Sequence, residues 1–174
     1  MLVENEYGGE GTGFLVFRPN KPESNEGKVF LITNKHVLNP DPEKRDKATK
    51  ITLHLNIQNE NNNIVKQKVE MPTNIGSSKS FREHPSEDVD VIAFDITQLL
   101  VEYPSIKIQI ATYEMLLTPD KIKDWDIKVG DPINVIGYPA GVRHRMTNFP
   151  IIRSGIISSM IGEELEDEYK VSRW

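Results

Sequence analysis

The chain alternates between short apolar runs and polar turn segments. Residues 11–17 and 28–33 are two apolar runs, and the ten residues between them are rich in Pro, Asn, Ser and Gly. Two apolar runs joined by such a segment are typical of a β-hairpin with a long loop. Residues 50–58 alternate apolar and polar positions, which predicts a strand with one buried face. Four apolar side chains share that face: Ile51, Leu53, Leu55 and Ile57.

The next segments continue this pattern with less regularity. Residues 63–71 alternate less cleanly and are predicted to form a strand, with the polar segment 59–63 as the turn before it. Residues 89–96 are almost continuously apolar, which predicts a strand buried on both faces. Residues 96–102 are predicted to form a short helix.

The second part of the chain has the same texture. Thr118 followed by Pro119 predicts one helical turn over 118–125, because Thr is a favoured N-cap residue and Pro is favoured at the first helical position. Many short strands with little helix are typical of an all-β sandwich or barrel. Three further strands are predicted, at 106–111, 132–139 and 150–158.

Composition narrows the class of protein. The 174 residues, 37% hydrophobic and 27% charged, are typical of one soluble globular domain with a sizeable core. A net charge of −5 argues against nucleic acid, whose binding depends on clustered Lys and Arg. The absence of cysteine excludes a disulfide, a Cys zinc site and a Cys nucleophile within these residues. It also slightly favours a reducing cytoplasm, but the compartment stays open. The polar, acidic start predicts neither a signal peptide nor a membrane segment.

The most distinctive candidate for chemistry is a histidine at the end of an apolar strand. In FLITNKHVL (30–38) the strand ends at Thr33, a short turn follows, and His36 stands before two apolar residues that return to the core. An imidazole at the end of a strand and at the edge of a cleft is well placed to act as a general base.

An acidic residue directly before a buried strand is the second candidate. In EDVDVIAFDI (87–96), Asp88 and Asp90 both precede the apolar run, whereas Asp95 lies within it. A carboxylate at the rim of a strand can accept a hydrogen bond from the Nδ1–H of a histidine, which fixes the ring tautomer. Position alone leaves Asp88 and Asp90 open as the partner.

Together these segments resemble the trypsin-like peptidases of the chymotrypsin fold, particularly the bacterial HtrA-like and related branches. No single segment is decisive, but the matches stand in the family's order over nearly the whole chain. The matching segments are GTGFLV (11–16), ITNKHV (32–37), DVIAFDI (90–96), GDPINVIGYPAG (130–141) and IIRSGIISS (151–159).

The resemblance implies a fold and two catalytic residues. It implies an all-β domain of two antiparallel β-barrels, the first over residues 1–105 and the second, incomplete, over 106–174. His36 takes the role of the family's base, and Asp90 takes that of its orienting acid. A register that begins at Asp88 fits less well, because it puts Asp90 where the family has a small or apolar residue.

The nucleophile is the part of the family pattern that these residues lack. None of the serines has the flanking glycines of the family's G-[DN]-S-G-[GS]-P segment. The family spacing places the nucleophile about ninety residues after the aspartate, at roughly residue 180. We therefore expect a serine-type endopeptidase truncated before its nucleophile, so that the 174-residue chain alone does not cleave peptides. A cysteine in place of the serine, as in some relatives, and the lack of any nucleophile stay open. The serines set aside are Ser77, Ser78, Ser154, Ser158 and Ser159.

The resemblance implies partners as well. A peptide or protein substrate is expected, with no cofactor and no metal. The alternative is a pseudo-peptidase that binds peptides or a partner without catalysis. A second possibility is a peptidase whose strands are completed by another chain, and an exposed sheet edge makes a homo-oligomer plausible.

The remaining histidines and charged runs have simpler interpretations. A metal site of His84, Asp88 and Asp90 fits no familiar ligand spacing. His54 is out of phase with the apolar face of its strand and is predicted to be exposed. His144, between two arginines, is predicted to lie in a solvated loop. Two surface loops are predicted, the Pro- and charge-rich segment 39–50 and the acidic segment 162–169.

Overall fold

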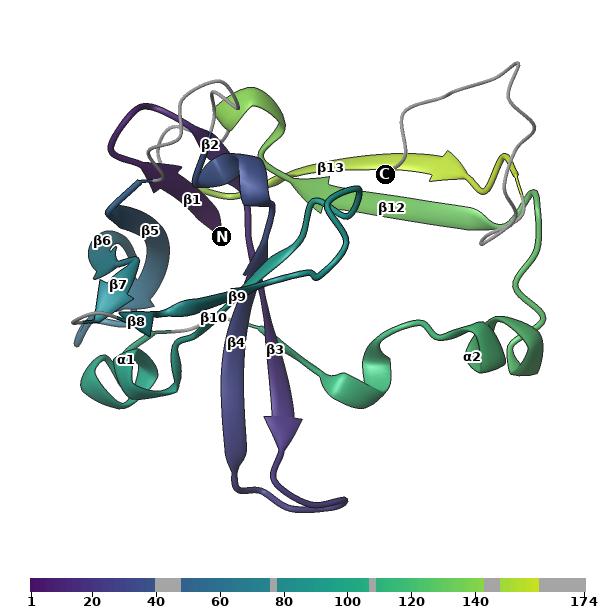
Figure 1. The fold of residues 1–174 in the computed structure, drawn as a ribbon, viewed down its shortest axis with the longest axis horizontal. Helices are drawn as coiled ribbons and strands as arrows, with labels where there is room; N and C mark the ends of the chain where they lie inside the picture. The colour runs from purple at the N-terminus through teal and green to yellow at the C-terminus, as the bar shows by residue number, and fades with distance from the viewer. Residues whose placement is uncertain (40–47, 76–77, 107–108, 143–147, 160–174) are drawn as a thin grey trace. The chain divides into compact units, whose positions relative to one another are not determined.

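The computed structural model describes residues 1–39, 48–75, 78–106, 109–142 and 148–159, and these residues form an all-β protein. They contain thirteen strands and two short α-helices (Figure 1). The prediction of an all-β fold is therefore confirmed. The predicted loop 39–50 lies mostly outside the described residues, and the acidic segment 162–169 lies wholly outside them.

The first sheet has four antiparallel strands in the order β2-β1-β5-β6. The alternating segments at 50–58 and 63–71 form β5 and β6, as predicted. The sequence analysis missed β1, because the start of the chain looked polar. Leu2 and Val3 are nevertheless fully buried, since they lie beside the central strand β5. The strands are β1 (Leu2–Asn5), β2 (Glu10–Thr12), β5 (Lys50–Gln58) and β6 (Ile64–Pro72).

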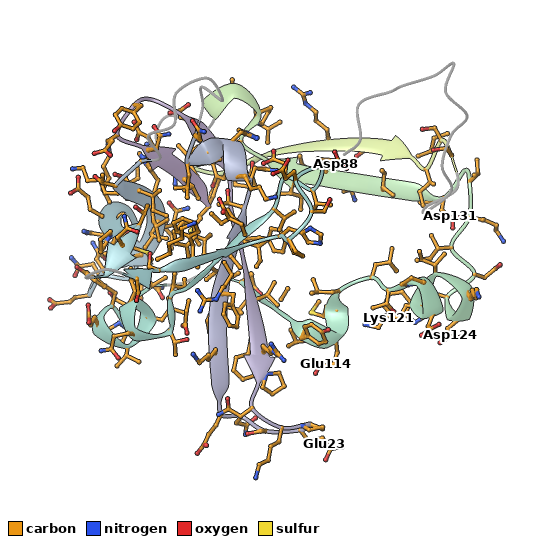
Figure 2. All side chains as sticks on the ribbon, in the orientation of Figure 1. Glu23, Asp88, Glu114, Lys121, Asp124 and Asp131 are labelled. Carbon is orange, nitrogen blue, oxygen red and sulfur yellow. The ribbon has the colours of Figure 1, made fainter. Side chains whose placement is uncertain are left out.

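The second sheet has five strands in the order β11-β3-β4-β10-β9. Its centre is the predicted hairpin of β3 and β4, whose loop carries Glu23 in a left-handed conformation near the tip (Figure 2). Only β11 runs parallel to its neighbour, β3. The strands are β3 (Phe14–Pro19), β4 (Gly27–Thr33), β9 (Phe81–Glu83), β10 (Ile92–Asp95) and β11 (Ile110–Thr112).

Gly13 marks the point where the chain passes from one sheet to the other. The run 11–17, predicted as a single strand, is divided there between β2 and β3. A Cβ on Gly13 would lie 2.6 Å from Leu31 Cδ1 and 2.8 Å from Val3 Cγ2. Glycine is therefore needed at this corner because the core side chains approach its backbone so closely.

The core contains residues of both sheets. Fully buried side chains include Val3 and Leu53 from the first sheet and Leu31, Ile92 and Phe94 from the second. The prediction that β10 is buried on both faces is wrong. Ile92 and Phe94 are buried, but Asp95 is exposed. This sheet covers the core with one face, so its strands alternate.

The remaining elements are short. Helix α1 (Thr97–Glu102) agrees with the predicted helix at 96–102. Two-residue strands, β7 (Asn74–Ile75) and β8 (Ser78–Lys79), form a separate pair. Helix α2 (Pro119–Asp124) begins as predicted, since the Thr118 hydroxyl accepts the Lys121 N–H at 3.4 Å. A last two-stranded sheet pairs β12 (Pro132–Gly137) with β13 (Ile151–Ile156).

The chain divides into two compact units. The first contains Met1–Leu116 and Ile136–Ile152, and the second contains Leu117–Val135 together with Arg153 onward. Strand pairing among the described residues gives open sheets without a closed ring. The division into two barrels at residue 105 therefore stays a prediction. None of the helices described is long and apolar enough to span a bilayer.

Candidate functional site

Strand pairing brings the two candidate residues to the same end of one sheet. Strands β4 and β10 are antiparallel, with Thr33 opposite Ile92. The segment that follows β4 therefore lies beside the segment that precedes β10. His36 lies in the first of these, on the 3-10 turn η1 (Lys35–Val37), and Asp90 lies in the second.

The side chains of His36 and Asp90 are in direct contact. His36 Nδ1 lies 2.5 Å from Asp90 Oδ2, and the backbone N–H of His36 donates to Asp90 Oδ1 at 3.1 Å. One carboxylate thus binds both the ring and the backbone of the same histidine. An acceptor at Nδ1 favours the tautomer with the proton on Nδ1, which leaves Nε2 to accept a proton. The side chains of His36 and Asp90 are 58% and 46% exposed, so the pair is open to a substrate.

The electrostatics of the pair favour an ionised carboxylate. Burial is the largest single influence on Asp90 and raises its pKa. The hydrogen bonds from the ring and backbone of His36, the charge of that ring and the backbone N–H of Lys35 together outweigh burial. The pKa of Asp90 therefore lies below its ordinary value, as expected for a carboxylate that stabilises an imidazolium.

Polar contacts fix the turn on both sides of the pair. The Asn34 amide donates to the Asp90 carbonyl at 2.8 Å, and Lys35 Nζ donates to the Ser86 carbonyl at 2.7 Å. Val37 is fully buried and anchors the turn in the core. The backbone that carries His36 is therefore attached to the loop that carries Asp90.

Residues 137–139 (GYP), at the end of β12 and the start of the turn after it, pack against β2. The Tyr138 N–H donates to Thr12 Oγ1 at 2.8 Å, and a Cβ on Gly137 would lie 2.7 Å from the same oxygen. The carbonyl of Thr12 in turn accepts the Thr33 hydroxyl at 2.9 Å. Thr12 therefore links this segment to the end of the strand that leads to His36.

The prediction that His54 is exposed is wrong. Its side chain is only 9% exposed, and its Nε2 lies 2.7 Å from Glu4 Oε2. The His54 carbonyl also accepts the Asn148 amide at 3.1 Å. Leu2 lies opposite His54 on the same face of the sheet and is fully buried, so this second face of β5 is covered too, and the alternating pattern identified only the first.

Several other residues that the sequence singled out lie in the described part of the chain. Asp88 lies in the turn before β10 (Figure 2), but the carboxylate that contacts His36 Nδ1 is that of Asp90. The Ser86 N–H donates to His84 Nδ1 at 3.2 Å, and the Ser154 hydroxyl donates to Asn134 Oδ1 at 2.8 Å within the second unit.

Other residues of the sequence analysis are not in the described part of the chain. Ser77 and the cluster of Arg143, His144 and Arg145 fall in its gaps. Ser78 lies in β8, and Ser158 and Ser159 follow β13. In the residues that are described, no group of three or more His, Cys, Asp or Glu side chains is arranged to hold a metal ion.

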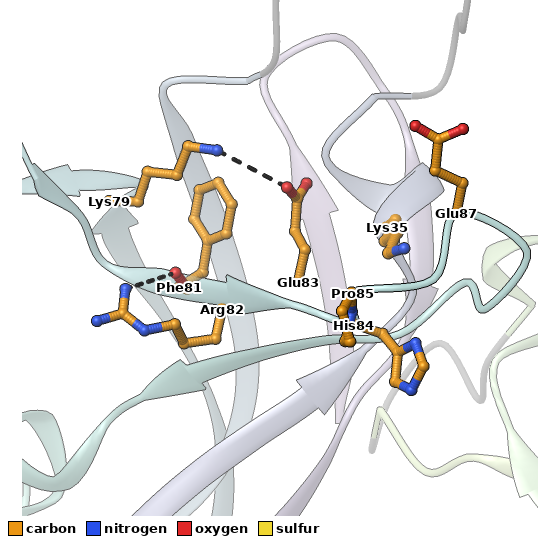
Figure 3. A pocket seen from close by; sticks show the side chains of 8 residues that line it. All are labelled: Lys35, Lys79, Phe81, Arg82, Glu83, His84, Pro85 and Glu87. Atoms are coloured by element: carbon orange, nitrogen blue, oxygen red, sulfur yellow. Dashed lines mark hydrogen bonds and ion pairs between the residues drawn. The ribbon is translucent and has the colours of Figure 1, made fainter.

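A pocket of about 570 Å³ lies along the edge strand β9 and the turn after it (Figure 3). Phe81 and His84 line it from this segment, and Lys35 lines it from the His36 turn. Two of its lining residues, Lys79 and Glu83, form an ion pair at 3.7 Å. Its lining is largely charged, unlike the mostly apolar lining of a small-molecule site.

Asn5 is a site residue that the sequence analysis missed. It lies at the end of β1, and its amide donates to the carbonyl of Val37 at 2.6 Å, next to His36. The sequence holds a local signal for its part in the turn, but none for its contact with Val37. Asparagine shortly before Gly8 and Gly9 is typical of a residue whose side chain closes a turn.

Comparisons of the chain with protein-family models, with curated proteins and with solved structures give no match.

Proposed function

We propose that this protein is a serine-type endopeptidase of the trypsin-like kind, with His36 as general base and Asp90 as the residue that orients it. The observation that carries the proposal is the 2.5 Å contact between His36 Nδ1 and Asp90 Oδ2. The second contact of the same carboxylate, to the His36 N–H, supports it because the ring and its backbone are held together. The ordered sequence resemblance adds independent support.

The two-barrel fold is part of the same proposal. The support is the order of the elements. A hairpin is followed by the histidine turn, a second hairpin of β5 and β6 follows, and the aspartate then precedes β10. We propose that residues 1–105 belong to the first barrel and that the nucleophile lies outside residues 1–174.

The chemistry proposed is acyl transfer. As the serine oxygen attacks the carbonyl carbon of a peptide bond, its proton moves to His36 Nε2. The imidazolium then gives this proton to the leaving amine as the C–N bond breaks, and water releases the acyl group by the same route. Ionised Asp90 stabilises the imidazolium in both steps.

The test uses the complete product of the gene, a fluorogenic peptide mixture and a fluorophosphonate that labels activated serines. His36→Ala and Asp90→Asn are each expected to lower kcat/KM on the order of 10³- to 10⁴-fold or more. His84→Ala is the matched control, since His84 is an exposed histidine that contacts the Ser86 N–H instead of Asp90. We expect it to retain both activity and labelling.

Two results would refute the proposal in different ways. Turnover that survives His36→Ala excludes His36 as the base. A complete gene product that binds peptides, but is neither labelled nor active, is a binding module instead of a peptidase.

A further inference from the structure

Asn5 is a buried polar residue that makes three hydrogen bonds with its side chain. It is 4% exposed. Its Oδ1 accepts the N–H groups of Tyr7 and Gly9, both at 2.8 Å, and its Nδ2 donates to the Val37 carbonyl at 2.6 Å. The side chain therefore joins the turn between β1 and β2 to the turn that carries His36.

The His36 turn needs such an external contact. It is a single 3-10 turn, closed by the Val37 N–H on the Asn34 carbonyl and the Leu38 N–H on the Lys35 carbonyl. The Val37 carbonyl points to the protein interior, where the Asn5 amide binds it. The chain also approaches closely here, because a Cβ on Gly11 would lie 2.4 Å from Val37 Cγ2.

His36 is thus held from two sides. On one side its N–H donates to the Asp90 carboxylate, and on the other the carbonyl of the following residue, Val37, is bound by Asn5. We infer that Asn5 is a positioning residue, which fixes the backbone of the turn so that Nδ1 of His36 faces Asp90. The catalytic meaning of this inference rests on the proposed function, but the positioning itself does not.

Asn5→Asp tests the inference with almost no change of shape. The new carboxylate still offers an oxygen to the Tyr7 and Gly9 N–H groups. The donor to the Val37 carbonyl is replaced by an oxygen, which repels that carbonyl. The readout is the tautomer of the neutral His36 ring, measured from the ¹⁵N shifts of its two nitrogens. We expect the Nδ1–H form in the unmodified protein and a shift toward the Nε2–H form in Asn5→Asp.

Tyr138→Phe is the control for a general loss of stability. It also removes one buried donor to a carbonyl, since the Tyr138 hydroxyl donates to the Asn148 carbonyl at 3.0 Å. This variant is expected to lower the midpoint of unfolding and to keep the Nδ1–H tautomer of His36.

Gly9→Ala is a second, milder perturbation for the case that Asn5→Asp does not fold. A Cβ at position 9 would lie 2.6 Å from Asn5 Nδ2 and would displace the amide. We expect the same direction of change in the tautomer, but smaller. If the folded variants at positions 5 and 9 keep the tautomer of the unmodified protein, the inference is wrong.

The outcome also separates the inference from the proposed function. A tautomer shift in a protein without peptidase activity upholds the positioning role and refutes the peptidase. Conversely, an active peptidase whose Asn5→Asp variant keeps both its tautomer and its kcat overturns the positioning role alone.

Discussion

Replacing Gly13 with alanine tests whether the corner between the two sheets has room for one more methyl group. The new Cβ would lie 2.6 Å from Leu31 Cδ1 and 2.8 Å from Val3 Cγ2. Both side chains are 0% exposed, so neither can turn into solvent to make room. Overpacking of this kind costs about 1–3 kcal/mol, whereas the loss of glycine's freedom in the unfolded chain returns about 0.4–1 kcal/mol. We expect a net loss of about 1–2 kcal/mol in the free energy of unfolding.

Urea denaturation followed by circular dichroism measures this loss. With a slope of about 2 kcal/mol/M, the midpoint should fall by about 0.5–1 M while the slope stays constant. Val3→Ala is the second substitution of a double-mutant cycle, because it removes the Cγ2 atom that the new methyl group would contact. The double variant should be less destabilised than the sum of the single variants by at least about 0.5 kcal/mol. Additive losses, or a Gly13→Ala protein as stable as the original, would refute the packing argument.

Two further predictions concern a charge and a helix end. The pKa of Asp90 is lowered in the folded protein, so its ionised side chain stabilises the fold. This contribution to the free energy of unfolding is complete above the pKa of the unfolded chain, about 4, and is lost as the pH falls through the pKa of the folded protein. Because the side chain is about half exposed, we expect this contribution to be less than about 1 kcal/mol. The stability of Asp90→Asn, measured by urea unfolding, should therefore fall less below about pH 4 than that of the unmodified protein. Thr118→Ala removes the cap of α2 and should speed amide exchange of Lys121 about fivefold, whereas Thr118→Ser should not. Equal exchange rates in both variants would contradict the cap.

Periodicity predicted most of the strands because it reflects burial directly. Residues 50–58 show it best, since Ile51, Leu53 and Leu55 all point to the core. The pattern failed where burial had another origin. Leu2 and Val3 were missed because a four-residue strand among acidic residues shows no period, and β1 is buried only through its place between β2 and β5 in the folded sheet.

The two main residues of the candidate site were predictable from the sequence, but the contacts that hold them in place were not. His36 and Asp90 were singled out because strand ends next to polar turns carry a local signature, but only the family resemblance favoured Asp90 over Asp88. Asn5 was not, because its contact with Val37 joins positions separated by 32 residues. His54 was misjudged for a similar reason, since the groups that cover it come from Glu4 and Asn148.

The tip of the hairpin of β3 and β4 is a suitable position for a spectroscopic label. The chain has no cysteine, so a single Asn25→Cys change at the exposed tip would give a unique thiol for a paramagnetic tag. β4 runs from Gly27 to Thr33, which at about 3.3 Å per residue is about 20 Å, and the tag and the His36 turn lie just beyond its two ends. At that separation the tag broadens the signals of a ligand beside His36 without touching it. Peptide binding could thus be mapped in solution even on a chain that performs no chemistry.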